Sequence, residues 1–312
     1  MELTADLVRE AAVRIRPLAR RTPVMTSRSV DERAGATIYF KCENFQRGGA
    51  FKIRGASNLI FSIPTQDLPR GVVAFSSGNH AQATAIAARH IGTPATIVMP
   101  FDAPRSKMEP TRALGAKIVT YDRLKENRED IAAEILKKSG ATLVPPYDHP
   151  LIMAGQGTAA LELMEDAPPL DALVVCVGGG GLMAGCATIA KSINPSIRIF
   201  AAEPERANDT WLSMKAGERV EIPSSDTVAD GLRSPAPGRL TFPVLQKFVE
   251  SVILVSENEI RESVRFLLSR MKILAEPSGA VAPAVALFQK LPKEIRSVGV
   301  IISGGNMDLD SL

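Results

Sequence analysis

Hydrophobic and polar positions alternate between helix-like and strand-like patterns along most of the chain. Leu7, Ala11, Ile15 and Leu18 recur at helical spacing and predict an N-terminal helix. Short apolar runs bounded by turn residues predict strands at 37–43, 71–77, 95–100, 116–122, 141–144, 170–177, 197–203, 251–257 and 297–305. Helical patterns fall between several of these strands, at 78–92, 105–115 and 125–140. Ser256 and Glu259 have the spacing of a capping box and predict another helix start.

This alternation predicts an α/β fold, in which helices cover both faces of a parallel sheet. Residues 71–148 hold about three βα units and are expected to form a smaller domain inserted into a larger one made of 1–70 and 149–312. The segment PPYDHP at 145–150 is expected to be the return crossing. The long irregular stretch at 224–240 is of the kind that often carries function.

Composition narrows the class of protein. The chain has 312 residues with 37 Lys and Arg against 34 Asp and Glu, no dense basic run and only 5% aromatic residues, which argues against a nucleic-acid partner. Three cysteines without a CxxC pair indicate neither a disulfide framework nor a zinc site. The charged N-terminus is not a signal peptide, and no apolar run is long enough to span a membrane. We therefore expect a cytoplasmic protein without a membrane partner.

One lysine has an unusual setting. In GGAFKIRGAS (48–57), Lys52 lies among small and apolar residues. Apolar surroundings lower the pKa of a lysine and free its amine to act as a nucleophile or base. The segment alone also fits an ordinary amphipathic lysine with a buried stem.

A run of four glycines, VGGGGLMAG (177–185), follows a predicted strand. Such a loop at a helix start brings backbone N–H groups close to a phosphate. It contains the weak dinucleotide pattern GxGxxA at Gly179, Gly181 and Ala184, and Glu203 lies where a ribose-binding acid would be expected. A Rossmann-type oxidoreductase using NAD(P) is therefore a serious alternative, and a plain tight turn is another.

Three more segments follow strand ends, where ligands bind in open parallel sheets. SSGNHAQA (76–83) places hydroxyl and N–H groups at a helix start, which suits a small carboxylate but also simple N-capping. SGGNMD (303–308) puts a serine where it could hydrogen-bond to a ring or a phosphate, but the segment also fits a plain turn. EPERAND (203–209) offers Glu203 and Asp209 as hard oxygen ligands for Mg2+, Mn2+ or Ca2+, or is a solvated loop.

Taken together, these motifs resemble the fold-type II pyridoxal-phosphate enzymes, and among them the threonine/serine dehydratase and serine racemase family. The resemblance rests on ENFQRGGAFKIRGA, SSGNHAQA, VGGGGLMAG and SGGN in this order, with AGQGT (154–158) and EPSGA (276–280) in matching places. It implies two open parallel-type sheets flanked by helices, in a large cofactor-binding domain and a smaller domain that contacts substrate. It also implies a homodimer.

The resemblance assigns roles to residues of this chain. Lys52 would hold pyridoxal phosphate covalently, and Ser77 would face the substrate Cα from the opposite side. The expected cofactor-binding residues are Phe51, Lys52, Asn79, Gly178, Gly179, Gly180, Gly181, Leu182 and Ser303. The expected substrate-binding residues are Ser76, Ser77, Asn79 and His80. A divalent cation would be bound by Glu203, Ala207 (through its carbonyl) and Asp209.

The resemblance also has departures. Gly48 stands where many relatives carry threonine or another side chain, and PPYDHP differs from the usual His-Pro start, which leaves substrate preference open. The chain ends soon after SGGNMD, so we expect no C-terminal regulatory domain of the biosynthetic threonine dehydratases. A substrate with a second carboxylate would need a further positively charged side chain to bind it. Arg112, Arg123 and Arg233 are candidates.

The leading hypothesis is an ammonia-lyase that removes water from L-threonine, L-serine or 3-hydroxyaspartate and yields a 2-oxo acid and ammonia. A serine racemase is the alternative within the family. The NAD(P)-dependent oxidoreductase is the alternative from another class, although it leaves Lys52 and SSGNH unexplained. A binding module without catalysis is a remote further alternative.

Overall fold

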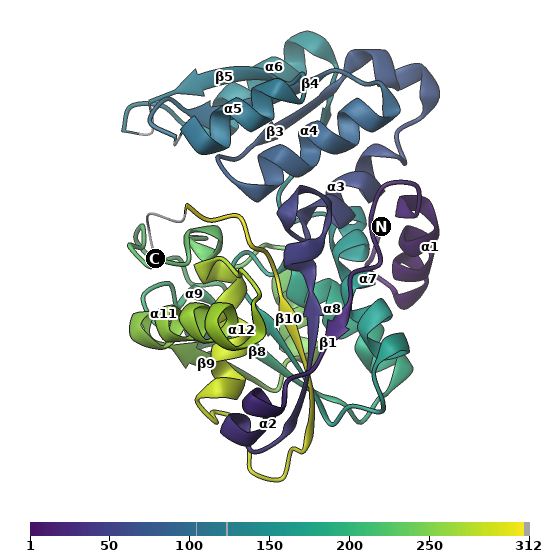
Figure 1. Cartoon of the computed structure of the whole chain (residues 1–312). Coiled ribbons are helices and arrows are strands. Elements are labelled where there is room, and N and C mark those ends of the chain that lie inside the picture. Colours follow the sequence, from purple (N-terminus) through teal and green to yellow (C-terminus); the bar gives the residue numbers. More distant parts are fainter. Residues whose placement is uncertain (104, 123, 309–312) are drawn as a thin grey trace.

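A computed structural model describes residues 1–103, 105–122 and 124–308. These residues form two β-sheets, each with its own set of helices (Figure 1). The larger sheet has the strand order β1 (Val24–Met25), β2 (Thr37–Cys42), β10 (Ser297–Ile302), β7 (Ala172–Cys176), β8 (Arg198–Pro204) and β9 (Ser251–Val255). The smaller sheet has the order β5 (Lys117–Tyr121), β4 (Ala95–Pro100), β3 (Val72–Phe75) and β6 (Thr142–Leu143). The predicted α/β class is therefore confirmed.

The larger sheet is mixed rather than purely parallel. Its strands pair in parallel except β1, which pairs antiparallel with β2 through Val24 opposite Lys41. The sequence predicted neither β1 nor its antiparallel pairing. A two-residue strand is too short to leave a periodic signal in the sequence.

Helices bury the central strands on both faces, which explains why those strands read as continuous apolar runs. Strands β7 and β10 are almost fully buried, and the core around them includes Val174, Phe200 and Val300. The helices of the larger sheet are α1 (Ala5–Ile15), α2 (Arg28–Ala34), α7 (Pro150–Asp166), α8 (Gly181–Ile193), α9 (Asp209–Ala216), α10 (Thr241–Phe248), α11 (Glu257–Phe266) and α12 (Pro277–Leu287), and α3 (Lys52–Ile60) lies between the two sheets. The smaller sheet carries α4 (Asn79–Ile91), α5 (Arg105–Ala113) and α6 (Arg128–Ser139).

Local signals set several helix ends. The predicted capping box of α11 is confirmed, because the Ser256 hydroxyl accepts the Glu259 N–H and the Glu259 carboxylate accepts the Ser256 N–H. Helix α1 ends at Ile15, one turn before the sequence pattern suggested, and Leu18 is buried after the helix rather than on it. A helical spacing alone does not show where the helix stops.

Close packing of α7 on α8 fixes the start of α8. The two helices meet at Gly157 and Gly185, and a Cβ added at Gly185 would lie only 2.0 Å from the carbonyl oxygen of Met153. Side chains would hold these helices apart, so the two glycines allow the backbones to approach. This contact places the N-terminus of α8 at the carboxyl end of β7.

The two sheets lie in separate lobes, with α3 and the 144–149 crossing between them (Figure 1). Helix α3 packs against both α4 of the smaller lobe and α7 of the larger one. The division into 1–70 with 149–312, and 71–148, stays our proposal. No helix in the described ranges is long and apolar enough to cross a bilayer.

Candidate active site

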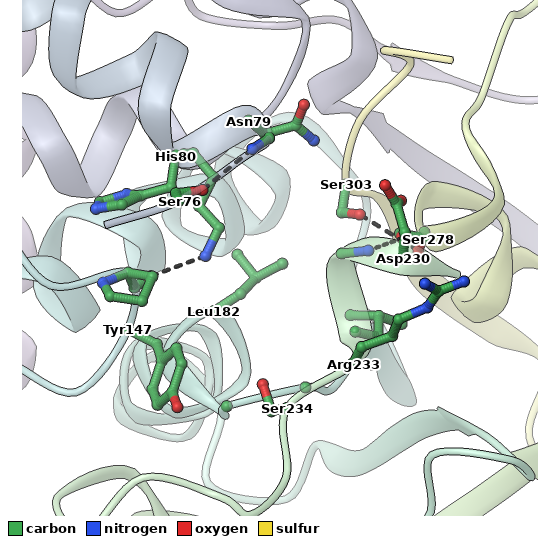
Figure 2. Close-up of a pocket in the computed structure, with 18 of the residues that line it drawn as sticks. Ser76, Asn79, His80, Tyr147, Leu182, Asp230, Arg233, Ser234, Ser278 and Ser303 are labelled. Atoms are coloured by element: carbon green, nitrogen blue, oxygen red, sulfur yellow. Dashed lines mark hydrogen bonds between the residues drawn. The ribbon is translucent and has the colours of Figure 1, made fainter. Parts of the chain in front are cut away.

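A pocket opens where strand ends from both sheets converge. Its walls come from the segments that follow β3, β7 and β10, together with the start of α3 and the 146–147 crossing (Figure 2). The pocket brings together every predicted cofactor and substrate residue: Phe51, Lys52, Ser76, Ser77, Asn79, His80, Gly178, Gly179, Gly180, Gly181, Leu182 and Ser303. The position agrees with the rule that ligands bind at carboxyl ends of parallel strands.

Lys52 begins α3 and extends its amine into this pocket. Its Nζ donates a hydrogen bond to the carbonyl oxygen of Pro146 at 2.7 Å and lies 5.0 Å from the centre of the Phe51 ring. Burial lowers the pKa of the Lys52 amine to about 8, because protein atoms replace the water that would solvate its charge. The amine is therefore partly unprotonated near neutral pH, as a nucleophile or base requires.

The glycine run forms a cradle of backbone donors. The Gly179 carbonyl turns away from the pocket to accept bonds from the Gly238 N–H at 3.1 Å and the Thr241 hydroxyl at 2.7 Å. Gly180 has φ of +90°, a conformation that disfavours other residues. Among the described residues, the N–H groups of 178–183 have no protein acceptor, and the last three begin α8. Such a cluster of free N–H groups at a helix N-terminus suits a phosphate.

Residues after β3 line the opposite side of the pocket. The Ser76 hydroxyl accepts a bond from the Gly78 N–H at 3.2 Å, and Ser77 also borders the cavity. His80 is tied elsewhere: its Nε2 lies 2.8 Å from the Val144 carbonyl oxygen. Burial lowers the pKa of His80 to about 3, so the imidazole is neutral and cannot supply a positive charge to a carboxylate. Any contribution of His80 to anion binding must come from its backbone.

Asn79 belongs to a chain of polar side chains that the sequence did not reveal. Its Nδ2 donates to Glu276 Oε1 at 2.7 Å, and its Oδ1 accepts from Asn306 Nδ2 at 3.0 Å. Glu276 stands just before α12, almost 200 residues along the chain, and lines the pocket. The sequence marks EPSGA only as a matching stretch and gives no role to this carboxylate.

Ser303 directly follows β10 and is buried in the pocket wall. Its hydroxyl donates a long 3.4 Å bond to the Ser278 carbonyl oxygen (Figure 2). Cys176 lines the same wall, and burial raises the pKa of its thiol to about 11. Ser303 and Cys176 therefore offer neutral groups here.

The predicted cation ligands lie outside the pocket, between β8 and α9. Glu203 is fully buried and accepts the N–H groups of Thr210 and Trp211, both at 2.8 Å. Burial raises the pKa of Glu203 to about 8 and that of Asp209 to about 7. Neither carboxylate oxygen of Asp209 has a hydrogen-bond partner among the described residues. Unpaired buried carboxyls are costly, which makes a bound cation physically reasonable.

The predicted extra arginines have different outcomes. Arg233 lines the pocket, but its guanidinium donates to the Thr227 carbonyl oxygen. Arg112 is exposed on α5 away from the pocket, and Arg123 lies outside the described residues. Arg128, which we did not predict, begins α6 and reaches the pocket mouth, with its guanidinium 5.3 Å from the centre of the Phe75 ring. The packing of α6 on β3 and β4, which brings Arg128 to the pocket, is a tertiary feature that no local pattern records.

The comparisons with known proteins agree with this geometry. Residues 15–304 match the family described as pyridoxal-phosphate dependent enzyme. The chain belongs to this family. It is 44% identical to serine racemase of Schizosaccharomyces pombe (98% of this chain, 95% of the relative) and 46% identical to L-threo-3-hydroxyaspartate ammonia-lyase of Saccharomyces cerevisiae (97% and 93%). Its structure matches maize serine racemase with TM-score 0.97 at 44% identity, over 100% of this chain and 96% of that one.

The structure also matches that of threonine deaminase isoform 2 from Solanum lycopersicum, with TM-score 0.91 and 33% identity over 99% of this chain and 92% of that one. Family membership removes the dinucleotide interpretation. The geometry agrees, because the Glu203 carboxylate binds the start of α9 rather than facing the glycine run.

The residues present fit pyridoxal phosphate. The free N–H groups of 178–183 suit its phosphate, and the Lys52 amine with its lowered pKa suits its aldehyde. Lys52 and the glycine run border one pocket, as a single small molecule with both groups requires. The buried, neutral Ser303 suits an uncharged ring nitrogen.

Proposed function

We propose that this protein is a pyridoxal-phosphate-dependent ammonia-lyase. It eliminates water from a β-hydroxy amino acid such as L-serine, L-threonine or 3-hydroxyaspartate and releases a 2-oxo acid and ammonia. The observation that carries this proposal is the Lys52 amine, with its pKa lowered to about 8, in one pocket with the glycine cradle and Ser303. The relatives named ammonia-lyase and threonine deaminase support it.

The cofactor, when bound, supplies an electron sink that weakens the bonds at the substrate Cα. The unprotonated Lys52 amine removes the Cα proton. The bond between Cβ and the hydroxyl oxygen then breaks, and the hydroxyl leaves as water with the proton that Lys52 took from Cα, so the amine is unprotonated again. The released enamine hydrolyses to the 2-oxo acid and ammonia. A neutral Ser303 would face the ring nitrogen of the cofactor without supplying a charge, and by the family resemblance this would favour elimination over transamination.

The substrate carboxylate binds at the start of α4. Ser76, Ser77 and Asn79 line the pocket there, and the helix dipole favours a negative charge. Because the His80 imidazole is neutral and bound to Val144, hydroxyl and N–H groups do the binding.

A second carboxylate, as in 3-hydroxyaspartate, is recognised by Arg128. Its guanidinium borders the pocket and has no hydrogen bond to a described residue, whereas that of Arg233 is held by Thr227. An arginine can bind a carboxylate through two parallel N–H donors. The ammonia-lyase of Saccharomyces cerevisiae, named for this substrate, supports the assignment.

Serine racemase is the second candidate function. Ser77 lines the same pocket as Lys52, and a hydroxyl facing Cα opposite the lysine would return a proton to the other face. The serine racemase of Schizosaccharomyces pombe is as similar to this chain as the ammonia-lyases are. One site would then serve both reactions.

A divalent cation, Mg2+, Mn2+ or Ca2+, binds Glu203, Asp209 and the carbonyl of Ala207. The partnerless oxygens of buried Asp209 support this part of the proposal. Two further parts are a homodimer, which rests on the family resemblance, and a cytoplasmic location, which rests on the sparse cysteines and the charged N-terminal segment. Sedimentation of the purified protein tests the first.

The test is a panel of L-serine, L-threonine and both 3-hydroxyaspartate diastereomers with the cofactor-loaded protein. We expect 2-oxo acid and ammonia in equal amounts from at least one of them, and chiral analysis of the remaining serine reports racemisation. Ser77→Ala should remove racemisation and retain elimination of the L-isomer. Turnover of none of the four substrates would contradict the proposed function.

A further inference from the structure

The side chain of Tyr147 lies directly against the glycine cradle. A Cβ added at Gly179 would be 2.4 Å from three carbons of the Tyr147 ring, and one added at Gly181 would be 2.8 Å from the Tyr147 Cβ. The ring therefore runs along the loop from Gly181 to Gly179. Only glycine at position 179 leaves room for it.

Neighbours on both sides hold Tyr147 in this place. The Pro146 carbonyl accepts hydrogen bonds from Lys52 at 2.7 Å and from Gln156 at 3.3 Å. The Asp148 carboxylate accepts the N–H groups of Arg239 and Leu240, at 3.0 and 2.8 Å, at the start of α10. Residues 146–148 thus connect the reactive lysine to the glycine loop, and the side chain of Tyr147 contacts that loop.

The Tyr147 hydroxyl is available to a ligand. It makes no hydrogen bond to any described residue, although its ring borders the pocket and is largely covered. Figure 2 shows the hydroxyl on the side of the pocket where Ser234 lies, away from Ser76 and His80. A hydroxyl without a protein partner on a residue that lines a pocket is one that a ligand can bind. Burial also raises the pKa of the phenol, so it stays a donor across the working pH range.

We propose that the Tyr147 hydroxyl donates a hydrogen bond to the phosphate of the cofactor and completes the cradle formed by 178–183. The inference rests on the proposed function, since it assumes a phosphate-bearing cofactor attached at Lys52. It adds the only side-chain hydroxyl we assign to the phosphate, where the family resemblance implied backbone groups of Gly178 to Leu182. A donor to a charged oxygen is worth about a tenfold change in affinity.

The experiment compares Tyr147→Phe with the wild-type chain in binding pyridoxal phosphate and pyridoxal, which lacks the phosphate. Dissociation constants come from absorption titrations of cofactor-free protein, without any activity readout. We expect Tyr147→Phe to raise the dissociation constant of pyridoxal phosphate about tenfold and that of pyridoxal less than about twofold. Inorganic phosphate should compete with the cofactor about tenfold less effectively in the variant. Tyr39→Phe, on strand β2 outside the pocket, is the matched control.

The two ligands separate the possible outcomes. Equal loss of affinity for both would mean that the tyrosine supports the site only by packing and would overturn the inference. Unchanged affinity for both would overturn it as well. If the wild-type chain binds neither ligand at Lys52, the proposed function fails and the inference fails with it. If the wild-type chain binds both ligands and Tyr147→Phe leaves the ratio of their dissociation constants unchanged, the inference is overturned and the proposed function is not.

Discussion

The Lys52 amine donates its hydrogen bond to the carbonyl oxygen of Pro146, 94 positions along the chain, at 2.7 Å. This bond joins the start of α3 to the crossing between the two lobes. It holds the amine at the pocket with no acidic partner among the described residues, so no carboxylate there offsets the lowering of its pKa by burial. The lysine is thereby prepared for chemistry before any ligand enters.

The lowered pKa of Lys52 predicts how cofactor capture depends on pH. Only the unprotonated amine attacks an aldehyde, and with a pKa of about 8 its fraction grows about tenfold between pH 7 and pH 9. Stopped-flow mixing of cofactor-free protein with pyridoxal phosphate should show a rate that rises in this window and levels off above it. A rate still climbing in proportion to hydroxide above pH 9 would indicate an ordinary lysine and contradict this assignment.

The buried carboxylates predict a stabilising cation. Mg2+ or Mn2+ should raise the melting temperature of the wild-type chain, because the cation pairs the partnerless Asp209 and its neighbour Glu203. The double variant Glu203→Gln with Asp209→Asn should lose this response. Glu218→Gln, an exposed change nearby, should keep it. An equal cation-induced shift in the double variant would place the cation elsewhere.

A buried ion-pair network predicts a large effect on stability. Glu43 and Arg54 are both fully buried and joined by two hydrogen bonds of 2.7 and 2.8 Å. Glu43→Gln leaves the guanidinium short of a counter-charge and should lower the free energy of unfolding by about 3 kcal/mol. Urea unfolding of Glu134→Gln is the control. Its exposed pair with Lys138 should contribute less than about 0.5 kcal/mol. Similar losses in the two variants would contradict the structural role.

Arg128 predicts substrate preference. Arg128→Gln should lower kcat/KM for 3-hydroxyaspartate by about 100-fold, as expected for losing a two-donor contact, and change that for L-serine less than about threefold. Arg112→Gln, on α5 outside the pocket, should leave both values unchanged. Equal losses for both substrates in Arg128→Gln would show that the arginine supports the pocket rather than recognising a second carboxylate.

The sequence predicted the parts of this fold that local patterns encode. Apolar runs marked β2, β3, β4, β5, β7, β8, β9 and β10. The central strands read as continuous hydrophobic segments because both of their faces are buried, whereas the edge strands β5 and β9 are only partly buried. The glycine run and Lys52 were found for the same reason, since their unusual composition is local. The ordered set of motifs then indicated the family.

The missing parts depend on contacts between distant segments. Glu276 reaches Asn79, and Tyr147 reaches Gly179, only after the two lobes and α12 have packed together. Arg128 lies in a charged segment that carries no local sign of a pocket residue, and only the packed structure brings it to the pocket. The neutral role of His80 was also hidden, since its bond to the Val144 carbonyl follows from burial rather than from the motif.

The most direct test of the account is the chemical trapping of the cofactor on the protein. The chain is loaded with pyridoxal phosphate, reduced with borohydride, digested and mapped by mass spectrometry. We predict the label on Lys52 and none on Lys41, a fully buried lysine that is paired with Glu162. A label at another lysine, or a protein that traps no cofactor, would contradict the central claim that Lys52 is the reactive amine of this site.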